Sequence, residues 1–175
     1  MKFIKTFSDW SNVTPELKAH IEEGLDLTTS FFRLGSEKYT ELFEEVKQYW
    51  DKGNIILKGP SGWMAKNLEV GKKAVDYKGN SIVLDSPTRG GKKKFIVYHN
   101  SGRKNKEGKI VGKKIEWGDP NLSVKNDDPK AASSFWARHK CDTVEKMNPL
   151  KAGFWACYGP TLFGKQLGLN SDNPW

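Results

Sequence analysis

The stretch that decides the fold is residues 92–117, KKKFIVYHNSGRKNKEGKIVGKKIEW. Its two ends, Lys94 to His99 and Ile110 to Trp117, are rich in β-branched and aromatic residues, which favour strands. Residues 100–109 between them are nearly all polar and include two glycines, which is typical of a hairpin tip. The stretch therefore predicts two antiparallel strands joined by a long polar connection.

Positive charge is concentrated in the same part of the chain. The 175 residues carry a formal net charge of +8. Residues 88–114 contain ten basic residues and one acidic residue, Glu107, a net of +9, whereas residues 1–57 have a net of −3. Because the basicity belongs to one segment, it indicates a binding site rather than general solubility. The ten residues, here called the basic segment, are Arg89, Lys92, Lys93, Lys94, Arg103, Lys104, Lys106, Lys109, Lys113 and Lys114.

The composition of the basic segment indicates what it binds. Lysines outnumber arginines by eight to two. Lysine is a flexible point charge that suits a phosphate backbone or an acidic protein surface, whereas arginine dominates base-specific contacts. A two-stranded ribbon can also enter a DNA major groove. The segment is therefore predicted to bind the DNA backbone or an acidic protein, and the simpler alternative is a solvated loop. Arg138 and Lys140, farther along the chain, join the candidate anion-binding residues.

Helical patterns lie on both sides of the strand region. Before it, apolar residues from Tyr39 to Val46 follow the i, i+3, i+4, i+7 spacing of a buried helix face. After it, Asp128-Pro129 and Asn148-Pro149 each combine a capping side chain with a proline suited to the first helical position. Gly159-Pro160 is expected to end the second of these helices.

Turn residues divide the chain into three regions. Gly59-Pro60-Ser61-Gly62 predicts a loop and a module boundary, and Lys78-Gly79-Asn80 predicts a second, shorter hairpin. The expected fold class is α+β: an acidic helical N-terminal region over residues 1–58, and central antiparallel β-hairpins forming a small basic sheet over residues 59–125. A helical C-terminal region over residues 126–175, which contains the His and Cys residues, is expected to form one compact domain with the sheet.

Composition excludes two classes of protein. Seven Trp and nine Phe, in a chain that is 37% hydrophobic, supply more burial than a disordered protein has. No apolar run approaches the roughly 20 residues that a membrane-spanning helix needs. The first residues also lack the apolar stretch of a signal peptide. We therefore expect no membrane partner and a chain that is made in a cytoplasm.

A second candidate site combines His139, Cys141 and Cys157. Imidazole and thiolate are the ligands of tetrahedral structural zinc sites. The chain has no evident fourth ligand and no CxxC pair. Three alternatives stay open: a structural zinc site, a disulfide between the two cysteines, or buried thiols without a ligand. No other cofactor is expected.

The familiar catalytic motifs are missing from the sequence, which has no GxSxG, Walker A, HExxH or dinucleotide-binding pattern. Asp119, Asp127 and Asp128, with nearby lysines, match the carboxylate sets of Mg²⁺-dependent nucleases in type but not in spacing. Aspartate is also common in turns, and Asp128 suits a helix cap. The sequence therefore predicts no enzyme and no catalytic residue, with a small metal-dependent nuclease as the main enzymatic alternative.

Four segments together carry a resemblance to a known group of proteins. They are residues 89–98 (RGGKKKFIVY), 117–121 (WGDPN), 128–141 (DPKAASSFWARHKC) and 152–157 (AGFWAC). They resemble small, largely uncharacterised proteins of tailed bacteriophages, some of which are virion structural proteins.

The resemblance implies a non-enzymatic virion component at the capsid or at the head-to-tail neck. Its partners would be other virion proteins, capsid or connector, with DNA as a further partner. Such a chain would be made in the host cytoplasm and then enter the virion, as a homo-oligomer or within a symmetric assembly. The alternative is an intracellular phage protein that binds nucleic acid or cuts it with a metal ion.

Overall fold

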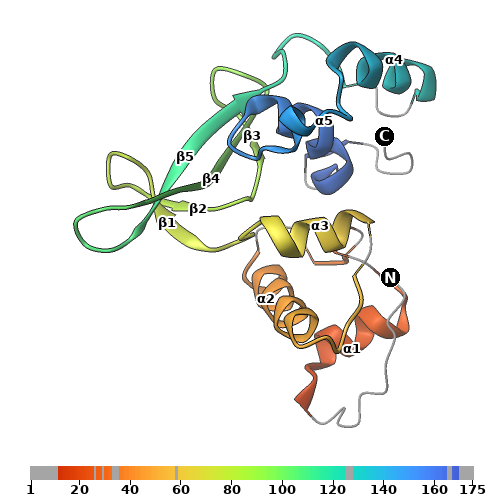
Figure 1. Ribbon diagram of the computed structural model, residues 1–175, viewed down its shortest axis with the longest axis vertical. Coiled ribbons are helices and arrows are strands. Elements are labelled where there is room, and N and C mark those ends of the chain that lie inside the picture. The colour runs from red at the N-terminus through yellow and green to blue at the C-terminus, as the bar shows by residue number, and fades with distance from the viewer. Residues whose placement is uncertain are drawn as a thin grey trace. The chain divides into compact units, whose positions relative to one another are not determined.

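The fold is known from a computed structural model, which describes residues 12–25, 27–28, 30–32, 36–57, 59–124, 128–164 and 167–169. The chain is α+β, with helices towards both ends and strands in the middle, as the sequence predicts. It divides into two compact units, Met1–Gly71 and Lys72–Trp175 (Figure 1). Each unit is described by itself.

Three helices build the first unit: α1 (Pro15–Glu22), α2 (Glu37–Asp51) and α3 (Gly59–Asn67). The helix expected from the apolar spacing is α2, and its buried side chains are Tyr39, Leu42, Phe43 and Val46. The Ser36 side chain caps it by accepting a hydrogen bond from the Tyr39 N–H. Local sequence signals therefore placed this helix correctly.

Helix α3 differs from the loop expected at residues 59–62. Pro60 suits a first helical turn, because an N–H there has no helical partner to lose. The buried Ser61 accepts a hydrogen bond from the Leu27 N–H at 3.2 Å, and Met64 and Ala65 are fully buried. Long-range contacts thus convert a turn-like sequence into a helix. The division between the units falls after Gly71, whereas the sequence analysis grouped residues 59–71 with the basic region.

A five-stranded mixed sheet forms the base of the second unit, in the order β2-β1-β5-β4-β3. The strands are β1 (Lys73–Val75), β2 (Ser81–Val83), β3 (Thr88–Arg89), β4 (Phe95–Lys104) and β5 (Ile110–Trp117). Strands β1 and β2 form the shorter hairpin that Lys78-Gly79-Asn80 predicts. The neighbouring pair β1–β5 is parallel, so hairpins alone do not make up the sheet.

The long antiparallel pair β4–β5, here called the ribbon, extends farther than the sequence predicts. Strand β4 was expected to end at His99 but continues to Lys104. The residues beyond His99 stay in the ladder because β5 offers backbone partners as far as the Lys104–Ile110 pair. Polarity alone therefore marked this segment wrongly as a loop.

A bulge at Ser101 and Gly102 interrupts the ribbon. Pairing passes from Asn100–Gly112 directly to Arg103–Val111, so β4 has two more residues here than β5. Gly102 adopts a φ of 76°, which favours glycine, and the Ser101 hydroxyl donates to the Val111 carbonyl at 2.6 Å. The bulge bends the ribbon locally and separates its outer end from its inner end.

Two helices and a short 3₁₀ helix complete the second unit: α4 (Pro129–His139), η2 (Val144–Met147) and α5 (Ala152–Phe163). Asp128 caps α4, as expected, by accepting from the N–H groups of Lys130 and Ala131. Helix α5 continues through Pro160, where the sequence predicted an end. Proline removes one backbone hydrogen bond, and burial of Leu162 and Phe163 on the next turn offsets that loss.

An aromatic core joins α5 to one end of the ribbon. Trp155 lies 5.7 Å from Trp117 and 5.8 Å from Phe163, measured between ring centroids. Phe95 lies 5.4 Å from Trp117 on the neighbouring strand. Figure 1 shows α5 beside this inner end of the ribbon, while the turn between β4 and β5 lies at the opposite end. The turn therefore projects away from the helices of its own unit.

Candidate functional site

Half of the basic segment is held by contacts within the protein. The Arg89 Nε donates to the Leu167 carbonyl at 2.8 Å, and the guanidinium lies 5.3 Å from the centre of the Phe95 ring. The Lys94 ammonium donates to the Leu122 carbonyl. These two cations, expected to face a partner, therefore also fix the loops around the inner end of the ribbon.

Three lysines of the ribbon also have partners. The Lys109 ammonium lies 2.8 Å from a Glu107 carboxylate oxygen, and the Lys114 ammonium lies 3.3 Å from that of Glu116. Lys113 donates to the Leu150 carbonyl at 3.2 Å. Exposed pairs of this kind stabilise a fold weakly, but they reduce the charge that is available to a partner.

The other five cations of the segment are exposed: Lys92, Lys93, Arg103, Lys104 and Lys106. Among the described residues, none of their side chains forms a hydrogen bond or ion pair. Arg103 and Lys104 end β4, and Lys106 lies in the following turn. These three residues, here called the ribbon tip, are the cations best placed to meet an anion.

Two carboxylates accompany the basic segment, and both are held ionised. The pKa of Glu116 is lowered chiefly by a hydrogen bond from the Lys92 backbone N–H, and further by Lys114. The Lys109 ammonium donates a hydrogen bond to Glu107, and this bond and the positive charge of Lys109 both lower the pKa of Glu107. Residues 103–109 still contain four basic residues against the single Glu107, so the outer end of the ribbon stays positive.

The structure separates Arg138 and Lys140 from the ribbon tip. Both are exposed at the end of α4, where Lys140 is the left-handed C-cap with a φ of 51°. Arg138 lines the same cavity as Lys93 and Lys94, at the inner end of the ribbon. Three of the candidate cations therefore lie around this cavity, apart from the three at the ribbon tip.

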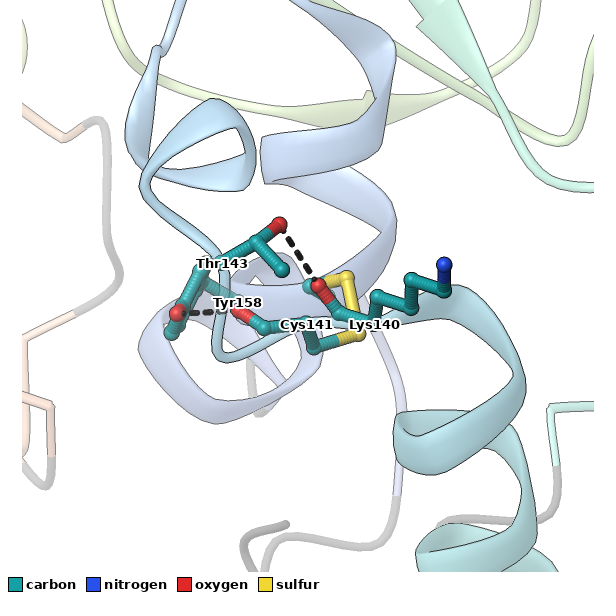
Figure 2. Close-up of a disulfide and its surroundings, with 5 residues drawn as sticks. Lys140, Cys141, Thr143 and Tyr158 are labelled. Atoms are coloured by element: carbon teal, nitrogen blue, oxygen red, sulfur yellow. Dashed lines mark hydrogen bonds between the residues drawn. A yellow bond between two sulfur atoms is a disulfide. The ribbon is translucent and has the colours of Figure 1, made fainter.

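Cys141 and Cys157 are joined in a disulfide that links the end of α4 to α5. Their Cα atoms are 5.6 Å apart, and both residues are buried. The Tyr158 hydroxyl donates to the Cys141 carbonyl at 2.6 Å, and the Thr143 hydroxyl donates to the Lys140 carbonyl at 2.9 Å. Figure 2 shows these two hydrogen bonds close to the disulfide. This clasp is one of the three alternatives that the sequence left open.

The zinc site stays a prediction for the reduced protein. While the two sulfurs are bonded to each other, neither can supply the thiolate that zinc needs. The His139 ring packs against Phe135, with centroids 4.2 Å apart, and burial together with the charges of Arg138 and Lys146 lowers its pKa. Within the described ranges, no group of three His, Cys, Asp or Glu side chains is gathered to hold a metal ion.

The carboxylates considered for a nuclease have structural roles where they can be seen. An Asp119 oxygen accepts from the Asn121 N–H at 2.8 Å in a turn. Asp128 caps α4. Asp127 lies outside the described residues. The two visible aspartates are therefore accounted for by backbone hydrogen bonds.

Asp85 and His99 form a buried pair that the sequence does not predict. Asp85 is fully buried, and His99 Nδ1 lies 2.6 Å from its Oδ1. Because a carboxylate can only accept, the histidine nitrogen donates. The pair ties the turn after β2 to β4. Its residues are 14 apart, and neither lies in a recognisable motif.

The cavity near Arg138 was not predicted from the sequence either. Its walls include Ala131, Phe135 and Arg138, which are spaced four and three residues apart on α4. This spacing places side chains on one helix face and was a usable signal. Trp117, at the end of β5, was the other available signal, because an aromatic residue at a strand end packs readily against a helix.

Comparisons with protein-family models, curated proteins and solved structures find no match to this chain. Among the helices that the structure describes, none has the length and apolar character needed to cross a membrane.

Proposed function

We propose that this protein is a non-enzymatic DNA-binding component of a bacteriophage particle, attached at the capsid or neck, and that the ribbon tip contacts the phosphate backbone. One observation carries the proposal. Arg103, Lys104 and Lys106 are exposed, have no side-chain partner among the described residues, and lie at the end of the ribbon that α5 does not cover. Such a tip meets a partner without disturbing the core.

The chemistry of the tip favours a nucleic acid over an acidic protein. Duplex DNA presents about one negative charge per 1.7 Å of axis, so several cations on one narrow ribbon find partners in any register. A major groove about 12 Å wide admits a two-stranded ribbon. Flexible lysines match this repetitive charge.

Two further observations support a particle component. The segments resembling phage proteins include residues 89–98, which hold four cations of the basic segment, and the residues around both cysteines. Disulfides are rare in a reducing cytoplasm and persist outside cells. A Cys141–Cys157 disulfide thus agrees with a protein that is made in the host and leaves it in a particle. The structural roles of Asp119 and Asp128 support a protein without nuclease chemistry.

The salt dependence of DNA binding tests the proposal. Affinity for a 30-base-pair duplex is measured by fluorescence anisotropy across a series of NaCl concentrations. The tip variant is R103S/K104S/K106S, and the control K66S/K130S/K151S removes the same charge from exposed lysines elsewhere. Each lost phosphate contact lowers the slope of log K against log salt by about 0.9, so the tip variant is expected to lose up to about 2.7.

An unchanged slope in the tip variant would show that the ribbon tip is only solvated, and equal losses in both variants would show a general charge effect. Mass spectrometry of purified particles tests the other half of the proposal. Absence of the chain from particles overturns the structural role. Cleavage of a plasmid by the protein with Mg²⁺ or Mn²⁺ overturns the non-enzymatic assignment.

A further inference from the structure

A cavity of about 520 Å³ lies in the second unit, at the inner end of the ribbon. Its lining comes from the start of β4, the end of β5 and the loop that follows, and from α4 and α5. The volume is within the range of about 300–1,000 Å³ that is usual for small-molecule sites. Neither the basic ribbon tip nor the disulfide accounts for this cavity.

Aromatic and aliphatic side chains form most of the cavity wall. Phe95 and Trp117 line the cavity but belong to the buried core and add little exposed surface, since they are 2% and 5% exposed. Phe135 on α4 also lines it, and so do Ala156 and Pro160 on α5. Leu122, in the loop after β5, is 65% exposed and adds apolar surface to the wall. The wall therefore suits a flat, apolar group.

Positive charge surrounds this apolar wall. The exposed side chains of Lys93, just before β4, and of Arg138, on α4, line the cavity. Neither side chain has a hydrogen bond or ion pair within the described part of the chain. Asp119 is the one carboxylate among the lining residues, and one of its oxygens is already used by the Asn121 N–H. A ligand with an apolar ring and an anionic substituent matches both features.

We propose that this cavity receives an unpaired base of a nucleic-acid strand, whose flanking phosphates lie against Lys93 and Arg138. The inference rests on the proposed function and narrows its substrate to nucleic acid that has a single-stranded part. Bases present a π-face to aromatic walls whatever their sequence, and cations at the rim follow the backbone. Lys93 and Lys94 lead directly into β4, so the cavity and the ribbon tip lie at the two ends of one strand.

The length of β4 sets the size of the probe. Ten residues at about 3.3 Å each separate the cavity from the ribbon tip by about 30 Å. A 12-nucleotide single strand spans about 40 Å even at the 3.4 Å spacing of a stacked strand, so it can reach both ends. The probes are a labelled 12-mer, the same 12-mer with abasic sites in place of all its bases, and a 12-base-pair duplex.

The matched variants are A131W and A137W. Ala131 lines the cavity, and a tryptophan there fills it without changing any charge. Ala137 is exposed on the same helix and does not line the cavity, so A137W controls for the new side chain. Loss of base stacking is expected to weaken binding of the 12-mer to A131W between about fivefold and a hundredfold. Binding of the abasic strand and of the duplex should change by less than about twofold in both variants.

The outcomes separate this inference from the proposed function. If A131W binds the 12-mer as tightly as A137W does, the cavity proposal is overturned, while a weakened R103S/K104S/K106S variant still supports DNA binding. If the wild-type protein binds the intact and abasic strands equally, the cavity proposal also fails. If the wild-type protein binds none of the three probes, the proposed function fails together with it. Circular dichroism of both variants confirms that each is folded before binding is compared.

Discussion

Replacing both cysteines by alanine is expected to destabilise the second unit by about 3 kcal/mol. The disulfide joins residues that are 16 apart, and closing a loop of about that size lowers the entropy of the unfolded chain by an amount worth about 3 kcal/mol at 25 °C. For a domain of roughly 100 residues, each kcal/mol shifts Tm by about 4–8 °C. The Tm of this unit should therefore fall by about 12–24 °C.

Differential scanning calorimetry of the whole chain measures the effect. In C141A/C157A and in the reduced wild-type protein, the Tm of the second unit should be lower than in the oxidised protein, and by the same amount. The transition of the first unit should stay in place, because both cysteines of the chain lie in the second unit. Y158F is the matched control: it removes the hydrogen bond to the Cys141 carbonyl, worth about 1 kcal/mol, and leaves the disulfide intact.

Two results would refute this reasoning. Thiol titration of the untreated, unfolded protein could detect two free cysteines, in which case the clasp is not covalent. Alternatively, the oxidised and reduced proteins could melt at the same temperature although titration shows that the bond is broken. Adding Zn²⁺ to the reduced protein tests the zinc alternative directly, since a restored transition and measured zinc binding would assign His139 and both cysteines to a metal site.

Two other perturbations probe the two units separately. Burial lowers the pKa of His20, whose Nδ1 donates to the Glu16 carbonyl and whose Nε2 accepts from Ser30. Below the unfolded-state pKa of about 6.5, the unfolded chain binds a proton that the folded chain resists. The free energy of unfolding of the first unit should therefore fall as the pH is lowered from 7.5 to 5, and it should fall less in H20Q. Equal urea midpoints of the wild-type protein at both pH values would contradict this. In the second unit, a methyl group on Gly112 would lie 2.3 Å from Ile82 Cδ1, which is the movable end of a half-buried side chain, so G112A should cost only about 1 kcal/mol, and I82A should relieve that cost. Strictly additive effects in urea unfolding of G112A, I82A and the double variant would show that the two side chains do not collide.

The sequence correctly predicted the helices and turns that residues close by in the chain stabilise. The Asp128 cap and the apolar spacing from Tyr39 to Val46 each involve residues within two turns of a helix, and α4 and α2 follow from them. The same holds for Lys78-Gly79-Asn80, where the Asp76 side chain accepts from the Lys78 and Asn80 N–H groups. A single sequence contains all of this information.

The incorrect predictions concern elements that distant residues stabilise. Helix α3 depends on a hydrogen bond from the Leu27 N–H to Ser61, 34 residues away. Five of the ten cations predicted to face a partner also have contacts within the chain. Arg89 bonds to a carbonyl 78 residues away and Lys113 to one 37 residues away, and a count of charges cannot detect either contact. Whether two cysteines pair depends in turn on how α4 packs on α5 and on the redox conditions.

The bulge at Ser101 and Gly102 affects how the sequence of this protein can evolve. A bulge absorbs inserted residues, so the pairing from Phe95–Trp117 to Asn100–Gly112 does not depend on what lies beyond it. Residues 103–109 can therefore gain or lose length and charge while the aromatic core keeps its register. Related chains are expected to vary most in this outer turn, which would let one scaffold carry different charge patterns.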